Sequence, residues 1–221
     1  VKRYNVIVLS DEIYSELSFE KNYKSISNVC AEKTIISTGL SKWCGAGGWR
    51  LGHFVIPKTL NKIRDAMNIL ASETFSSVSA PVQFAAIKAY SHDYSEYKNN
   101  SRKILELVGN YVFKNLKSNK ILINKSRGGF YLMPEFLNKC FSNSAEMCDD
   151  LLKKTGVALL PGSDFGISKN KMLARLSFTD FDGQTFLKNI NKQKILDDEL
   201  IFKFAPKIVK GVNKLKKWSE S

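Results

Sequence analysis

Two short apolar runs, both rich in β-branched residues, most constrain how this chain can fold. The first covers residues 5–10 (NVIVLS) and the second covers residues 34–38 (TIIST). Such runs are typical of strands that are buried in a parallel sheet. Because ligands of open parallel sheets bind just outside the carboxyl ends of the strands, the residues that follow these runs are the first candidates for a functional site.

An acid, a phenol and a lysine follow the two predicted strands. Asp11 and Tyr14 come after the first strand, and Lys42 comes after the second. Arg50 follows Lys42 across a glycine-rich turn. A lysine amine forms a Schiff base with an aldehyde, an aspartate can keep a pyridinium nitrogen protonated, a phenol can donate to a phenolate oxygen, and an arginine suits a phosphate. The four side chains therefore suit a cofactor that carries both an aldehyde and a phosphate.

These residues belong to an ordered series of motifs that extends over residues 5–180. Asp-x-x-Tyr and Ser-Lys lead to further motifs at residues 48–52 (GWRLG), 79–83 (SAPVQ), 128–132 (GGFYL), 161–166 (PGSDFG) and 174–178 (ARLSF). Each motif alone has an ordinary structural explanation, such as a solvated strand end or a flexible turn. Their joint occurrence in this order favours a functional explanation. The series resembles the pyridoxal-phosphate-dependent aminotransferases of fold type I, class I/II.

The resemblance implies a role for each matched residue. Lys42 resembles the Schiff-base lysine, Asp11 the partner of the ring nitrogen, Tyr14 the partner of the ring oxygen, Arg50 a phosphate ligand, and Arg175 the clamp on the substrate α-carboxylate. The implied cofactor is pyridoxal 5′-phosphate. The implied reaction moves an amino group between an amino acid and a 2-oxo acid, with the freed Lys42 amine carrying the proton.

The resemblance also implies an α/β fold with two parts. Residues 1–95 are expected to form the carboxyl-terminal part of a large cofactor-binding domain, whose mixed, mostly parallel sheet has helices on both faces. Residues 96–221 are expected to form a smaller α/β domain with its long connecting helix. The local pattern predicts a helix capped by Thr59 and running to about Leu70, and a helical tail interrupted at Pro206. It also predicts a long helix from about Tyr94 to Asn119, whose apolar stripe consists of Ile104, Leu105, Val108, Val112 and Leu116.

Two departures from the family pattern stand out. Many members have a hydroxyl residue three positions before the lysine, where this chain has Gly39. Members are also considerably longer than 221 residues. We therefore expect a carboxyl-terminal portion that lacks the opposite wall of the cofactor site, and strands near Asn5 and Thr34 that lack neighbours.

Two other functions remain open at this point. A β-lyase or a related enzyme of the same fold would use the same four residues, and amine transfer to 2-oxoglutarate, compared with pyruvate release from cystathionine, would separate these reactions. The second alternative is a catalytically silent fragment, because half of the cofactor site is expected to be absent. The resemblance further implies a homodimer for the full-length protein.

Composition is consistent with a cytoplasmic α/β protein. The chain is 43% hydrophobic and 25% charged. Its net charge of +13 comes mostly from lysines spread over predicted helices, which indicates a solvated surface rather than a specific nucleic-acid site. Four cysteines without a CxxC pair and only two histidines predict no metal site. No apolar run approaches the length needed to cross a membrane.

Overall fold

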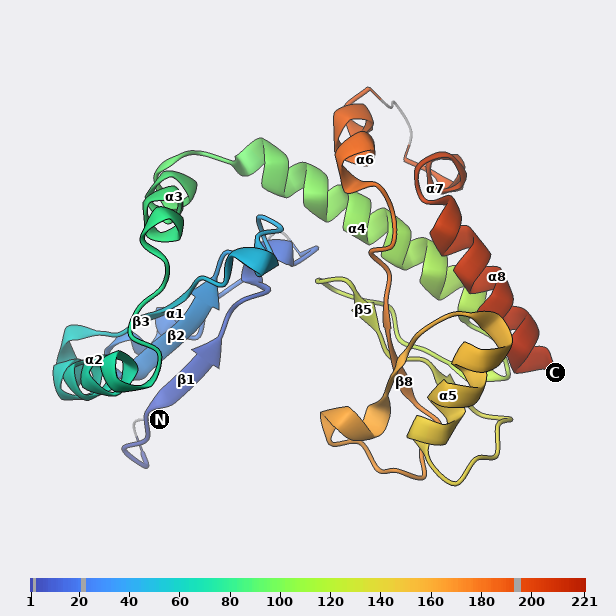
Figure 1. Cartoon of the computed structure of the whole chain (residues 1–221), viewed down its shortest axis with the longest axis horizontal. Coiled ribbons are helices and arrows are strands. Elements are labelled where there is room, and N and C mark those ends of the chain that lie inside the picture. Colours follow the sequence, from blue (N-terminus) through green and yellow to red (C-terminus); the bar gives the residue numbers. More distant parts are fainter. Residues whose placement is uncertain (2, 21–22, 193–195) are drawn as a thin grey trace. The chain divides into compact units, whose positions relative to one another are not determined.

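The computed structural model describes residues 1, 3–20, 23–192 and 196–221. The chain has an α/β fold and divides into two compact units, Val1–Lys98 and Asn99–Ser221, which are described separately (Figure 1). The domain boundary expected at residue 95 stays a prediction. In the described residues, no helix is both long enough and apolar enough to cross a membrane.

A three-stranded sheet forms the centre of the first unit. Its strands are β1 (Val8–Asp11), β2 (Thr34–Gly39) and β3 (Gly52–Val55), in the order β1-β2-β3. β1 pairs with β2 in parallel, whereas β3 pairs with β2 in antiparallel. The loop of residues 40–51 between β2 and β3 contains a 3₁₀ turn (Gly47–Trp49) but no α-helix that would cross over the sheet, which agrees with the antiparallel pairing of these two strands.

This sheet differs from the expected one in two respects. The mostly parallel sheet is not seen in the described residues, because one of the two strand pairs is antiparallel. The expectation that the strand near Thr34 lacks neighbours is wrong, because β2 is the central strand. β1 and β3 are the edge strands of this sheet, and Leu9, Phe54 and Val55 on them are exposed.

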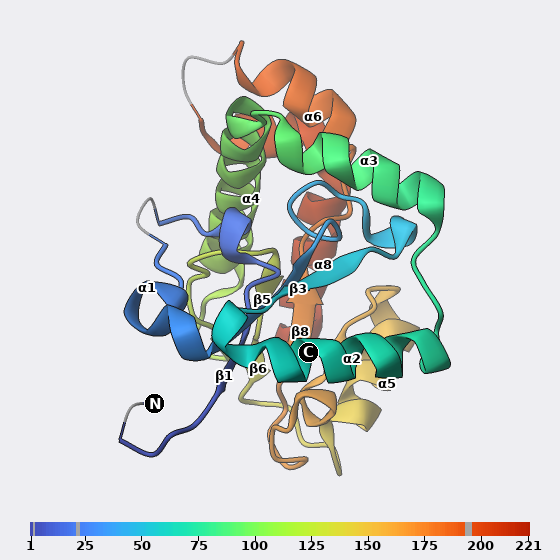
Figure 2. The same cartoon turned by 90° about the vertical axis from the view of Figure 1, so that its left-hand side faces the viewer.

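Helices α2 (Asn61–Thr74) and α3 (Ala80–Ser91) lie at opposite ends of β3. α3 lies near the beginning of β3 and α2 near its end (Figure 2). The predicted cap of α2 is wrong: Thr59 belongs to a preceding 3₁₀ turn, and its hydroxyl donates to the carbonyl of Glu32 instead. None of the residues of α2 is buried. The helices of this unit are α1 (Ser27–Cys30), α2 (Asn61–Thr74), α3 (Ala80–Ser91) and the start of α4 (Ser95–Leu116).

The second unit packs helices around short antiparallel strands. The buried stripe on α4 contains the five predicted residues, Ile104, Leu105, Val108, Val112 and Leu116. The predicted break at Pro206 is also confirmed, because it separates α7 (Asp198–Phe204) from α8 (Pro206–Glu220). Residues 193–195 of the predicted helical tail lie outside the described residues.

The carboxyl-terminal helices belong to the core of this unit. α8 packs against α5 and α7, and the indole nitrogen of Trp218 donates to Asp150 Oδ2 at 3.0 Å. The strands form one sheet in the order β5-β8-β7 and one β4-β6 pair. The remaining elements are β4 (Ile121–Leu122), β5 (Tyr131–Leu132), β6 (Glu135–Phe136), α5 (Ser144–Thr155), β7 (Leu160–Pro161), β8 (Ala174–Ser177), α6 (Gly183–Ile190), α7 (Asp198–Phe204) and α8 (Pro206–Glu220).

Candidate active site

Lys42 lies in the compact loop between β2 and β3. The loop is closed at its base, where the Leu40 amide donates to the Leu51 carbonyl at 3.2 Å. The Ala46 amide donates back to the Leu40 carbonyl, also at 3.2 Å. Gly45 has a φ of +66°, a value that glycine adopts without steric cost. The backbone of the loop therefore holds Lys42 just beyond the carboxyl end of β2.

The structure brings Lys42 and Tyr14 together. The Lys42 Nζ atom lies 5.5 Å from the centroid of the Tyr14 ring, within the range of a cation–π interaction. Tyr14 follows β1 and Lys42 follows β2, and these two strands are parallel neighbours. The contact therefore forms where the two strands end.

Asp11 is the last residue of β1 and lies opposite Ser37 of β2. Its side chain is exposed, and its Oδ1 atom accepts a hydrogen bond from the Ile13 amide at 3.2 Å. This bond closes a turn that leads the chain from Asp11 toward Tyr14. A negatively charged acceptor therefore lies at the end of the strand that precedes Tyr14.

Arg50 has a left-handed backbone conformation, with φ 55° and ψ 48°. A residue other than glycine in this region carries strain of about 1–3 kcal/mol, and such strain is concentrated at functional sites. The exposed guanidinium donates from Nη1 to the Gly47 carbonyl at 2.6 Å. This bond occupies one N–H group of the guanidinium and holds the guanidinium against the glycine-rich turn.

The loop that holds Lys42 is attached to the rest of the first unit through Trp43. The indole is 6% exposed and packs in a cluster with Leu40, Leu51 and Ala86. Lys98 lies over the same ring, with its Nζ atom 5.2 Å from the centroid, and also pairs with Glu16 at 2.9 Å. Sequence reasoning missed this role of Trp43. A large aromatic residue directly after the lysine was the available signal.

Cys44 is a packing residue in this loop. Its thiol donates to the Leu40 carbonyl at 3.1 Å, and it packs against the cluster around Trp43. Burial raises the pKa of the Cys44 thiol, which lowers the fraction of reactive thiolate at neutral pH. The structure gives no support for a nucleophilic role of this cysteine.

Gly39 has a steric reason to be glycine. A Cβ atom at this position would lie 2.6 Å from the Leu51 carbonyl oxygen and 2.9 Å from Gly52 Cα. Both atoms belong to the backbone of the neighbouring chain segment, which cannot move aside by a rotamer change. The close approach of β2 and β3 therefore excludes the hydroxyl residue that many family members have here.

We expect Gly39→Ser to destabilise the protein by about 1–3 kcal/mol, because the new side chain has to displace backbone atoms. Gly48→Ser is the matched control, since a Cβ atom there meets nothing within 4 Å. The free energy of unfolding in urea measures both effects. Equal values for the two variants would contradict this account of Gly39.

Arg175 lies on β8 in the second unit, opposite Leu160 of β7. Its guanidinium carbon is 4.3 Å from the centroid of the Tyr131 ring and 4.2 Å from that of Phe165. Two aromatic contacts restrict the orientation of the guanidinium and leave its N–H groups available for a planar anion. Sequence reasoning noted the motifs that contain Tyr131 and Phe165 but missed this role.

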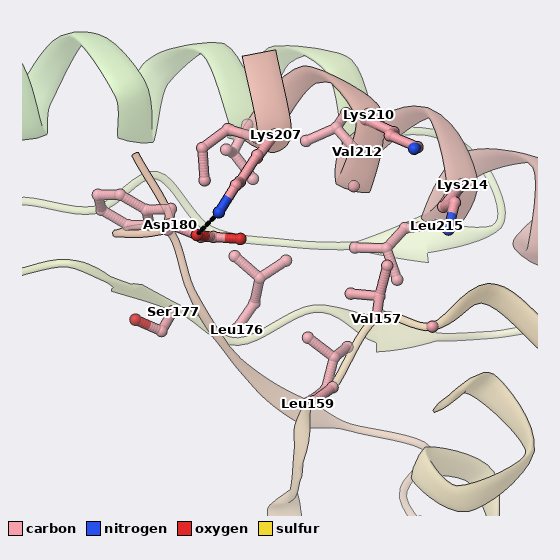
Figure 3. A pocket seen from close by; sticks show the side chains of 16 residues that line it. Val157, Leu159, Leu176, Ser177, Asp180, Lys207, Lys210, Val212, Lys214 and Leu215 are labelled. Carbon is pink, nitrogen blue, oxygen red and sulfur yellow. Dashed lines mark hydrogen bonds and ion pairs between the residues drawn. The ribbon is translucent and has the colours of Figure 1, made fainter. Parts of the chain in front are cut away.

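The second unit also has a cavity of about 470 Å³ beside β8 and α8 (Figure 3). Its apolar wall includes Leu159, Leu176 and Leu215. At its rim the Lys207 amine forms an ion pair with Asp180 at 3.2 Å. Arg175 is not among its lining residues, so this cavity contains none of the predicted site residues.

Comparison with known proteins points to one family. A family model described as aminotransferase class I and II matches residues 1–186. The probable N-acetyl-LL-diaminopimelate aminotransferase of Bacillus subtilis is 35% identical over 184 residues, which are 80% of this chain and 44% of that protein. An aspartate aminotransferase of Geobacillus stearothermophilus is 32% identical over 186 residues, 80% of this chain and 46% of that protein.

Solved structures agree with these sequence relatives. An alanine aminotransferase from Pyrococcus furiosus matches with a TM-score of 0.78 and 26% identity, over 99% of this chain and 50% of that chain. An aspartate aminotransferase from Thermotoga maritima has the same fold, with a TM-score of 0.73 over 49% of its length. The chain spans about half the length of the relatives that it matches.

Proposed function

Because this chain belongs to the class I and II aminotransferases, we propose that it carries part of the site of a pyridoxal-phosphate-dependent aminotransferase. The reaction moves an amino group between an amino acid and a 2-oxo acid. The observation that carries the proposal is the Lys42 amine beside the Tyr14 ring, where two parallel strands end. This is the position at which open α/β sheets bind ligands.

The chemistry of the side chains fits pyridoxal phosphate. An amine suits the aldehyde, a carboxylate suits the ring nitrogen, a phenol suits the ring oxygen and a guanidinium suits the phosphate. Lys42, Asp11, Tyr14 and Arg50 supply these groups in that order, all from the first unit. When bound, the cofactor supplies an electron sink that makes the α-hydrogen of an amino acid acidic.

The residues of the first unit have separate tasks in this proposal. Lys42 would bind the aldehyde carbon through its amine, with the aldehyde oxygen leaving as water. As a free amine it would take a proton from the substrate α-carbon and return one at the end of the transfer. Asp11 holds the proton of the ring nitrogen. Tyr14 donates a hydrogen bond to the ring oxygen and also contacts the Lys42 amine through its ring. Arg50 binds the phosphate.

Arg175 binds the substrate α-carboxylate in the same proposal. A guanidinium presents two parallel N–H donors, which match the two oxygens of a carboxylate. The contacts with Tyr131 and Phe165 support this role, because an oriented guanidinium loses less conformational freedom when it binds. We further propose that the whole protein is a cytoplasmic homodimer with additional parallel strands in its large sheet.

Capture of the cofactor aldehyde tests the proposal. The chain is mixed with pyridoxal phosphate, reduced with borohydride and digested, and the modified lysine is located by mass spectrometry. We expect modification of Lys42 at cofactor concentrations that leave exposed lysines such as Lys62 unmodified. The control is pyridoxine phosphate, which has no aldehyde. Modification spread evenly over surface lysines would contradict the proposed site.

The reaction itself is tested by product analysis. Amine transfer from an amino acid to 2-oxoglutarate is the expected result. Release of pyruvate from cystathionine without amine transfer would identify a β-lyase instead.

A further inference from the structure

Glu12 is the only acidic or basic side chain that is buried in the described part of the chain. It is 8% exposed, and it lies in the sequence between Asp11 and Tyr14. Removing a carboxylate from water costs free energy unless its oxygens accept hydrogen bonds. The contacts of Glu12 therefore indicate what this buried group stabilises.

Hydroxyl groups donate to one oxygen of the Glu12 carboxylate. Its Oε1 atom accepts a hydrogen bond from Ser25 at 2.6 Å and one from Ser10 at 3.1 Å. The pKa of Tyr23 is raised, mainly by burial and to a smaller extent by the charge of Glu12 and by a hydrogen bond with Glu12. The Oγ atoms of Ser25 and Ser27 are 2.7 Å apart, so the bonding continues into the start of α1. Glu12 thus connects β1 to the segment 23–27.

The backbone of Glu12 also attaches the end of β1 to β2. Its amide donates to the Ser37 carbonyl at 2.8 Å and so continues the pairing with β2 beyond Asp11. Side chains alternate along a strand, and Ser10 and Glu12 share the inner face. Leu9 and Asp11 occupy the exposed face. The hydrogen bonds of Ser10 and Glu12 therefore hold the end of β1 on the face opposite to the Asp11 side chain.

We propose that Glu12 is a positioning residue for Asp11 and Tyr14. By binding the end of β1 to the segment 23–27, it fixes the directions of the Asp11 carboxylate and the Tyr14 phenol toward the cofactor ring. This role rests on the proposed function of those two residues. A glutamine can replace part of the bonding, because its amide oxygen accepts the same hydroxyl protons, whereas an alanine replaces none of it.

Amide hydrogen exchange of the cofactor-free chain is the first test. We expect Glu12→Ala to raise exchange in residues 11–14 by about tenfold or more, while α2 and α3 keep their wild-type rates. The exchange rates of residues 11–14 in Glu12→Gln are expected to lie between those of Glu12→Ala and those of the wild type. Ser25→Ala, which removes the shortest hydrogen bond to the Glu12 carboxylate, is expected to raise exchange in the same residues. Glu73→Ala on the exposed side of α2 is the control.

Cofactor affinity is the second test. We expect the dissociation constant of pyridoxal phosphate to rise by about tenfold in Glu12→Ala, less in Glu12→Gln, and not in Glu73→Ala. Wild-type exchange rates in residues 11–14 of the Glu12 variants would overturn the positioning role. An equal rise throughout the first unit would overturn it too, since Glu12 would then stabilise only the fold.

The outcomes separate the two proposals. If Glu12→Ala does not fold, Glu12→Gln and Ser25→Ala provide the same comparison. If the wild-type chain does not bind pyridoxal phosphate, the proposed function fails for this chain, while the exchange experiment still decides whether Glu12 positions residues 11–14.

Discussion

Replacing Lys42 with alanine is expected to abolish covalent capture of pyridoxal phosphate and to lower transamination by about 10²–10⁴-fold, the usual contribution of a positioned acid–base group. Alanine has no amine to bind the aldehyde or to move the α-proton. Stability is expected to change little, because the Lys42 contact with the Tyr14 ring contributes only about 0.5–1 kcal/mol. Borohydride capture and steady-state rates measure the two losses.

Two further variants isolate the cause of this loss. Lys42→Arg keeps the positive charge near Tyr14 but removes the primary amine, so it is expected to lose capture as alanine does. Lys62→Ala removes an exposed lysine of α2 and is expected to leave capture unchanged. Normal capture by Lys42→Arg would show that another lysine binds the aldehyde.

Replacing Trp43 with alanine is expected to have the largest effect on stability. The indole is 6% exposed, and removal of a buried aromatic ring costs about 3–5 kcal/mol because a cavity remains. The same change removes the contact with Lys98 and loosens the loop that carries Lys42. We therefore expect lower stability together with weaker binding of pyridoxal phosphate.

Trp49 provides the matched control within the same loop. Its side chain is 56% exposed, so Trp49→Ala is expected to change the free energy of unfolding by no more than about 0.5 kcal/mol. Urea unfolding followed by circular dichroism compares the two variants. Similar losses for both tryptophans would mean that the cluster around Trp43 does not hold the loop.

Local sequence patterns predicted the elements that position the site. The β-branched runs located β1 and β2, and the spacing of apolar residues located α4 with its buried stripe. These predictions succeeded because the pattern of apolar residues that indicates a strand or an amphipathic helix lies within a short stretch of the sequence. The Thr59 cap failed because the chain forms a 3₁₀ turn at Lys58–Leu60 before α2 begins, and the threonine hydroxyl in that turn donates to the carbonyl of Glu32, which is distant in the sequence.

The sequence alone determined the family and the candidate residues, because an ordered series of motifs carries both. Only the tertiary structure showed why Gly39 is glycine, how Trp43 holds the Lys42 loop, and that Glu12 is buried among hydroxyls. Each of these depends on atoms that are far apart along the chain and meet only when the strands pair and the loops pack. Such distances leave no periodic signal in the sequence.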